Sequence, residues 1–218
     1  SDLMPGSGHL MGGQTVYLKM REAKVIEDLM ITNEKGVTGG MKMANGTNSM
    51  RNSGGFPGTR AKSASLVREL FLKAQEYKNK IDKAGKDSSK LPERDLRMEP
   101  LVEILNGKRV VHFHSHKSND IFTAIRLSKE FGFRIVLHHL SEGWMVADEI
   151  AQAGVPCSII NIEVPGGKME ATNLTLKTGA ILDKAGAMVA FHTDDGVTDS
   201  RLFLRTAALS IREGKIGR

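Results

Sequence analysis

Histidines recur at the ends of apolar runs in this sequence, an arrangement that can hold a metal ion. Six of the seven histidines lie at such ends, namely His112, His114, His116, His138, His139 and His192. Asp194 follows the last of them by two positions. Neutral imidazoles together with carboxylates are the ligands of a Zn²⁺-type catalytic site, in which one position stays open for water. A single strand-end histidine is more often a hydrogen-bonded core or loop residue, but the recurrence favours a metal site.

The apolar runs alternate with amphipathic segments from about residue 107 onward. The runs cover residues 110–114, 135–139, 157–160 and 188–191, and the expected helices cover about 121–131, 146–153, 171–184 and 200–212. Four strand–loop–helix units in series predict an α/β fold with parallel strands joined by right-handed crossovers. A doubly wound sheet and a (β/α)₈ barrel of the TIM type both fit this order.

Strand parity bears on that choice, because residues two apart in a strand share a face. His112 and His114 are expected on one face, and Val111 and Phe113 on the helix side. In the last run, Ala190, His192 and Asp194 share a face. His138 and His139 are expected to diverge, with His138 facing a helix and His112 in a packing or supporting role. A barrel turns one parity of every strand inward, so the convergence of imidazoles and a carboxylate favours the barrel.

The first half of the chain is less regular. Residues 14–20 and 37–44 are candidate strands, 45–58 a Gly/Asn/Ser-rich loop, 61–81 a strong helix, 83–92 a polar linker and 95–106 a short helix. We therefore expect a single domain over residues 1–218. Its less regular part covers residues 1–106, and its strand–helix repeats cover residues 107–214.

Composition excludes several classes of protein. The chain has 218 residues, 40% hydrophobic and 26% charged, and no run approaches the ~20 apolar residues of a membrane span. The net charge of +6 is interspersed with acidic residues, and no nucleic-acid-binding signature accompanies it, so no nucleic-acid partner is expected. The first residues resemble no signal peptide, and Cys157 is the single cysteine, so a reducing, cytoplasmic location is expected. Cys157 begins an apolar run and is expected to be an inert structural thiol.

Several segments resemble the amidohydrolase superfamily, in its imidazolonepropionase-like and prolidase-like branch. The similar segments are residues 111–116 (VHFHSH), 130–132 (EFG), 139–143 (HLSEG), 146–156 (VADEIAQAGVP) and 193–194 (TD). The resemblance is close over about residues 107–214 and looser over residues 10–80, through segments such as 41–44 (MKMA). It implies the C-terminal part of a (β/α)₈ barrel, with strands five to eight in residues 107–214.

The resemblance also implies an activity and residue roles. His114 and His139 would bind a divalent metal, Zn²⁺ above all, as one or two ions. Asp194, at the metal, would be the catalytic carboxylate that moves a proton from water to the leaving group. Lys42 would occupy the position at which some members carry a carboxylated lysine that bridges two metals. The implied reaction is hydrolysis of an amide-type C–N bond, cyclic or peptidic, by a metal-activated water.

Substrate choice is expected to lie in the loops after the strands, because barrel specificity resides there. The candidates are His116, Glu163, Lys168 and Glu170. The substrate is expected to be a small molecule or a peptide. An open barrel would also expose apolar strand edges, which favours a homo-oligomer.

The sequence departs from the superfamily pattern in ways that keep other interpretations open. No His-x-His pair precedes residue 112, and Gly46-Thr47-Asn48 stands where relatives have Gly-Glu-Asn. The chain also stops after the helix of the eighth strand, so we expect a partial barrel that lacks the first strand or strands. One alternative is a catalytically silent metal-binding or structural fragment of such a barrel. Another is an α/β binding domain without metal, whose histidines serve as hydrogen-bond donors.

Overall fold

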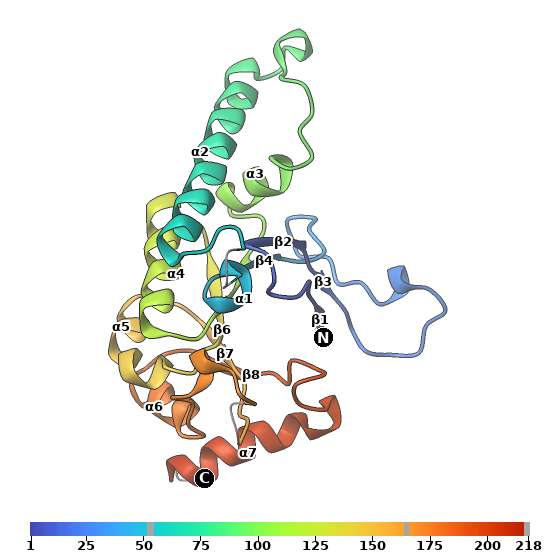
Figure 1. Cartoon of the computed structure of the whole chain (residues 1–218). Coiled ribbons are helices and arrows are strands. Elements are labelled where there is room, and N and C mark those ends of the chain that lie inside the picture. Colours follow the sequence, from blue (N-terminus) through green and yellow to red (C-terminus); the bar gives the residue numbers. More distant parts are fainter. Residues whose placement is uncertain (52–54, 164–165, 216–218) are drawn as a thin grey trace.

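A computed structural model describes residues 1–51, 55–163 and 166–215 as a mixed α/β structure built on one sheet (Figure 1). Its strand order is β2-β4-β5-β6-β7-β8, with bounds Met11–Gln14, Met41–Ala44, Val111–Ser115, Ile135–His139, Cys157–Ile159 and Val189–Phe191. Strands β4 to β8 are parallel, and β2 pairs antiparallel with β4. The two short strands β1 (Asp2–Leu3) and β3 (Val16–Tyr17) form a separate antiparallel pair.

Helices connect the parallel strands, as the repeat pattern predicts. Helix α4 (Ser118–Phe131) joins β5 to β6, η3 (Gly143–Val146) and α5 (Ala147–Gln152) join β6 to β7, and η4 (Met169–Ala171) and α6 (Thr178–Lys184) join β7 to β8. The last strand is followed by η5 (Ser200–Leu202) and α7 (Phe203–Gly214). The long connection from β4 to β5 holds α1 (Thr47–Met50), α2 (Arg60–Ala84), η2 (Ser88–Lys90) and α3 (Glu99–Leu105). The parallel sheet and its helices confirm the predicted α/β fold class.

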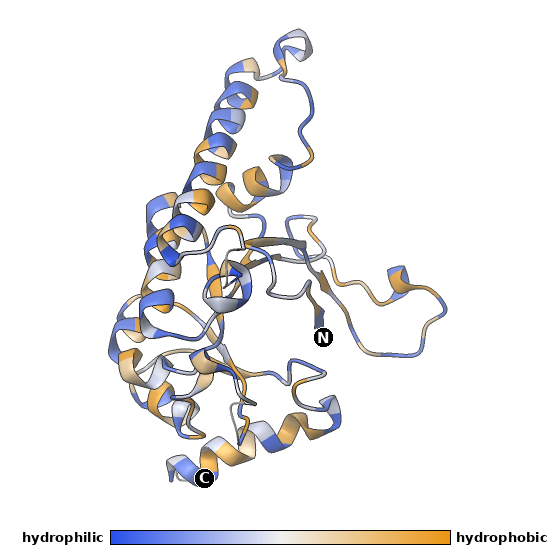
Figure 2. Ribbon diagram, in the orientation of Figure 1, coloured by the Kyte–Doolittle hydropathy of each residue, from blue (hydrophilic) through white to orange (hydrophobic). Residues whose placement is uncertain are grey.

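The hydrophobic core lies between the sheet and its helices. Met43, Phe113 and Leu137 are fully buried on neighbouring strands, and Phe71 of α2 stacks on Phe131, with ring centroids 5.0 Å apart. Helices α2 and α4 alternate hydrophobic and hydrophilic stretches along their length, as helices with one buried face do (Figure 2). Because strand residues alternate between faces, the opposite face of the sheet receives the polar residues, His112 and His114 among them.

Several sequence expectations for the first half need correction. The candidate strand 14–20 is divided between β2 and β3, and the candidate strand 37–44 shortens to β4. Gly39 and Gly40 explain the shortening: a Cβ on Gly39 would lie 1.8 Å from the carbonyl oxygen of Thr15. The chain there packs backbone against backbone, which only glycine permits. The expected loop 45–58 contains α1, and its residues 52–54 lie outside the described part.

The described strands form an open sheet, with β2 and β8 at its two edges. A closed (β/α)₈ barrel therefore stays a prediction. The helix expected over residues 171–184 is observed as the shorter α6, which begins at Thr178. In the part of the chain that the structure describes, no helix is both long and apolar enough to cross a membrane.

Candidate metal centre

The C-terminal ends of β5 and β6 bring three imidazoles together. The ring centroids of His114 and His139 lie 4.4 Å apart, and those of His114 and His116 lie 4.7 Å apart. The rings of His116 and His139 stack at 5.2 Å. All three residues are at least nine-tenths buried. The ends of parallel strands thus converge on one cluster, which is where functional residues gather in α/β folds.

His138 and His139 lie on the same side of the sheet, contrary to the expectation from strand parity. His138 is the register partner of His114 and packs against His112 and His192, so the prediction that it faces a helix is wrong. His139 has φ of 74° and Leu140 has φ of 57°. Two consecutive left-handed residues end the strand there and turn the His139 ring back toward the cluster. Alternation holds only while the backbone stays extended.

Three buried polar atoms at this cluster have no hydrogen-bond partner among the described residues, which is the condition expected of metal ligands. They are His114 Nε2, His139 Nε2 and Glu170 Oε1. His114 Nε2 lies 3.9 Å from Glu170 Oε1. Ligand atoms of His114, His116 and Glu170 all lie within 4.8 Å of one another, the spacing of groups around a single ion. The donor set of imidazoles and a carboxylate fits a divalent metal such as Zn²⁺.

Burial keeps the clustered imidazoles neutral. It lowers the pKa of His116 to about 3 and the pKa of His192 to about 4, and it moves the pKa of His139 well below its ordinary value. The pKa of His114 is lowered by burial as well. A neutral imidazole offers a lone pair to a cation, whereas a protonated one does not.

Glu170 is the carboxylate of this group, and it comes from the loop between β7 and α6. Its side chain is 1% exposed. Its Oε2 accepts a hydrogen bond from the backbone N–H of Thr47 at 2.8 Å. Burial opposes ionisation of Glu170, but His114, the Thr47 N–H and the Lys168 ammonium outweigh it and hold the pKa below its ordinary value. From the sequence, Glu170 is predicted to contact the substrate, since nothing in its local pattern indicates that the loop folds back onto His114.

His116 differs from its neighbours because both of its ring nitrogens have partners. Nδ1 lies 2.7 Å from Ser141 Oγ, and Nε2 lies 2.9 Å from Lys168 Nζ. His116 and Lys168, two predicted substrate contacts, therefore touch each other at the edge of the cluster. Glu163, a third, does not join them: its carboxylate is about half exposed and pairs with Arg205 of α7.

Asp194 lies beside His139, as the sequence predicts. Its Oδ2 is 3.9 Å from His139 Nδ1, and its side chain is 51% exposed. His192 lies between the strands, with Nε2 3.1 Å from His139 Nδ1 and Nδ1 3.0 Å from Ser158 Oγ. The structure thus brings together His114, His139 and Asp194, whose roles as ligands and base stay predictions. His192, which the sequence assigns only to the same strand face as Asp194, supports the ring of His139 in the structure.

Lys42 lies on the polar face of β4 as the register partner of His112. It is 6% exposed, and burial lowers the pKa of its ammonium, although Asp194 and Asp2 oppose that shift. His112 is hydrogen-bonded on both sides, with Nε2 2.8 Å from Tyr17 Oη and Nδ1 3.0 Å from His138 Nε2. This agrees with a supporting role for His112. Carboxylation of Lys42 is a prediction that its position permits.

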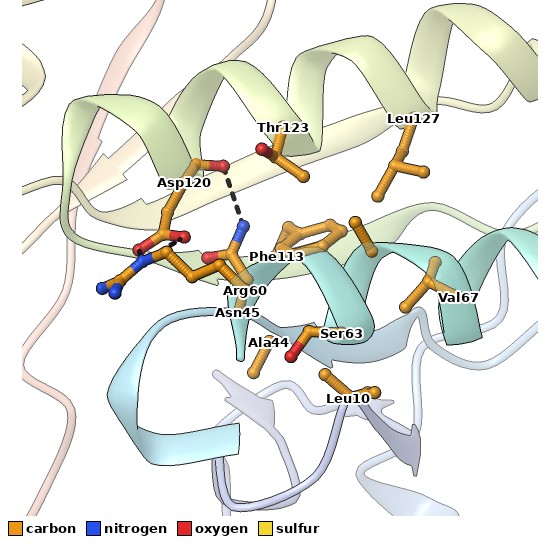
Figure 3. Close-up of a pocket in the computed structure, with 11 residues that line it drawn as sticks. Leu10, Ala44, Asn45, Arg60, Ser63, Val67, Phe113, Asp120, Thr123 and Leu127 are labelled. Atoms are coloured by element: carbon orange, nitrogen blue, oxygen red, sulfur yellow. Dashed lines mark hydrogen bonds and ion pairs between the residues drawn. The ribbon is translucent and has the colours of Figure 1, made fainter. Parts of the chain in front are cut away.

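A small pocket lies where α2 and α4 meet β4 and β5 (Figure 3). Arg60 Nε donates to both carboxylate oxygens of Asp120, at 3.0 Å each. Asn45 donates to the Asp120 carbonyl oxygen at 2.8 Å and accepts from Ser115 Oγ at 2.8 Å. Arg60 also lies 4.0 Å from Glu170. These bonds join the ends of β4 and β5 to the carboxylate of the candidate metal centre.

Comparison with solved structures identifies the fold. The crystal structure of an amidohydrolase from Thermotoga maritima MSB8 matches the chain with a TM-score of 0.89 and 31% sequence identity. The chain has an amidohydrolase-like fold. The match covers 98% of this chain and 55% of the amidohydrolase chain, so the chain spans about half the length of that protein. No protein-family model matches the sequence, and no match is found among curated proteins. Within this amidohydrolase-like fold, the buried group of His114, His116 and Glu170 could hold a metal ion.

Proposed function

We propose that this chain carries the metal centre of a hydrolase that cleaves amide-type C–N bonds, in a cyclic amide or a peptide. The observation that carries the proposal is a set of three buried ligand atoms without hydrogen-bond partners among the described residues: His114 Nε2 and His139 Nε2 at the ends of adjacent parallel strands, and Glu170 Oε1 of η4. Buried polar atoms without partners are costly, and a cation that accepts their lone pairs removes that cost. The likeness to the Thermotoga maritima amidohydrolase supports the same class of reaction.

His114, His116 and Glu170, whose ligand atoms lie within 4.8 Å of one another, would hold a divalent ion together with His139, and Zn²⁺ suits this donor set best. Lys42 in a carboxylated form would add a ligand for a second ion. When bound, such an ion lowers the pKa of a water from ~15.7 toward ~7 and polarises a carbonyl. Asp194 is proposed to handle the proton, and to contact the ion as the resemblance implies. It is half exposed and close to His139, so its carboxylate can accept a proton from the attacking water and return it to the leaving nitrogen.

The test combines metal content with turnover. The chain, and a version extended upstream, would be loaded with Zn²⁺ or Mn²⁺, measured by mass spectrometry of metals, and assayed on N-acyl amino acids, dipeptides and cyclic amides. We expect His114→Ala and His139→Ala to lose the ion. We expect Asp194→Asn to keep the ion and lose turnover by about 10²- to 10⁴-fold, the typical contribution of a general base.

Two results would replace this proposal. A bound ion without turnover in either version supports the catalytically silent metal-binding fragment. A chain that binds no ion supports the α/β binding domain in which the histidines act only through hydrogen bonds.

A further inference from the structure

Lys168 contacts His116 and Glu170, two members of the buried group of His114, His116 and Glu170 that could hold a metal ion. Its Nζ lies 2.9 Å from His116 Nε2 and 3.1 Å from Glu170 Oε1. Lysine ammonium is a donor only, so His116 Nε2 accepts from it and carries a lone pair. His116 Nδ1 then holds the ring proton and donates to Ser141 Oγ at 2.7 Å. Lys168 therefore uses the lone pair that His116 would otherwise offer to an ion.

The Lys168 ammonium forms an ion pair with the Glu170 carboxylate but no well-directed hydrogen bond. The ammonium is close enough to Glu170 Oε1 for an ion pair, yet this oxygen makes no hydrogen bond among the described residues. The ion pair supplies charge without directed bonding. A divalent ion would require the same carboxylate oxygen and the same imidazole lone pair. Because two cations cannot share these ligands at such distances without strong repulsion, occupancy by Lys168 and by a metal exclude each other.

Among Lys168, His116 and Glu170, only the Lys168 side chain can move away from the metal centre without disturbing the fold. Glu170 is 1% exposed and anchored by the Thr47 N–H, and His116 is buried and anchored by Ser141. The Lys168 side chain is 30% exposed and lies just before η4 in the loop between β7 and α6. Rotation of its long flexible stem moves the ammonium into solvent with no change in the sheet.

We propose that Lys168 is a tethered cation that occupies the His116–Glu170 side of the metal centre, and that a divalent ion binds there by displacing it. This inference rests on the proposed function, since it assumes that the centre binds a metal. It goes further in assigning a residue that sets the metal affinity. Metal binding then releases a lysine ammonium onto the rim of the centre, and removal of the ammonium strengthens metal binding.

The first experiment is a Zn²⁺ titration of the wild-type chain, Lys168→Met and Lys177→Met, by competition with a chromophoric chelator. Lys177 is an exposed lysine of the same loop and serves as the matched control. We expect Lys168→Met to bind Zn²⁺ on the order of 10- to 100-fold more tightly than the wild type, because a charged hydrogen bond of the ammonium no longer has to be broken. Lys177→Met should match the wild type.

The second experiment uses the wild-type chain alone, so it does not depend on a variant that folds. Acetylation by an N-hydroxysuccinimide ester, quantified by peptide mass spectrometry, should be faster at Lys168 when Zn²⁺ is present and unchanged at Lys177. Equal Zn²⁺ affinity in the wild type and Lys168→Met, or slower acetylation of Lys168 with Zn²⁺, overturns the inference and leaves the proposed function standing. Absence of Zn²⁺ binding in all three proteins overturns both.

Discussion

His139 and His192 are joined ring to ring, with His139 Nδ1 3.1 Å from His192 Nε2. The contact links the end of β6 to the residue after β8. With Ser158 Oγ 3.0 Å from His192 Nδ1, a consistent arrangement has His192 Nδ1–H donating to Ser158 and His139 Nδ1–H donating to His192. His139 Nε2 then presents a lone pair to the cluster. Partners of this kind orient a histidine and fix the ring nitrogen that binds metal.

We therefore predict that His192→Phe weakens Zn²⁺ binding by about 10- to 100-fold, the usual effect of removing a partner that orients a ligand. The measurement is competition with a chromophoric chelator, with circular dichroism as a check of folding. His9→Phe is the matched control, because His9 is exposed and lies outside the cluster. Equal affinity in both variants would show that His139 is oriented without His192.

Two arginines of α2 pair with carboxylates of α4 and allow a paired stability test. Asp120 is 3% exposed where it meets Arg60, whereas Glu130 is 32% exposed where it meets Arg68. We predict that Arg60→Met lowers the free energy of unfolding by about 3 kcal/mol, because it leaves a buried charge without its partner. Arg68→Met should change it little, because water screens an exposed pair. Urea denaturation measures the free energy of unfolding of both variants. Equal losses of stability would contradict the argument that burial distinguishes the two ion pairs.

Glu142 joins the start of α4 to the segment before α6, and its contribution to the stability of the fold should depend on pH. Its carboxylate accepts from Lys117 Nζ at 2.7 Å, the Ser118 N–H at 2.8 Å and Asn173 Nδ2 at 2.8 Å. Burial alone would raise its pKa, but these bonds outweigh burial and lower the pKa to about 2. A carboxyl group with a lowered pKa stabilises the fold above its unfolded-state pKa. That contribution is lost as pH falls from about 4.5 to about 2.

We predict that Glu142→Gln lowers the free energy of unfolding by about 2 kcal/mol at pH 7, the scale of hydrogen bonds to a charged group. The deficit relative to the wild type should shrink as the pH is lowered toward 3. Glu149→Gln, at an exposed position nearby, should behave as the wild type at both pH values. A deficit that stays constant between pH 7 and pH 3 would show that the charge of Glu142 is not the source of its effect.

Cys157 should be inert toward thiol reagents in the native protein. It is 1% exposed, and burial raises the pKa of its thiol to about 12, so almost no thiolate exists at pH 8. We predict that a chromogenic disulfide reagent labels the native chain slowly at pH 8 and stoichiometrically once guanidinium unfolds it. Complete labelling of the native chain within minutes would contradict this burial.

Much of the candidate site could be predicted from sequence, because its signals are local. The alternation of Val111, His112, Phe113 and His114 assigns opposite faces within one strand, and the structure places two of these residues in the core and two on the polar face. The four strand–helix units likewise follow from short-range periodicity, which needs no knowledge of distant residues. His114, His139 and Asp194 were singled out by the resemblance to the amidohydrolase superfamily, which also rests on short local segments.

Tertiary structure alone decided the rest. Glu170 reaches His114 through a loop whose path depends on its contact with Thr47, and Lys168 takes the remaining lone pair of His116 only because that loop folds back. His139 reaches the cluster through a left-handed backbone that parity cannot anticipate. The antiparallel pairing of β2 with β4 joins two strands that are separated by the irregular segment 15–40. The contacts of Glu170, of Lys168 and of β2 with β4 join parts of the chain far apart in sequence, so their energies arise only when the folded backbone brings these parts together.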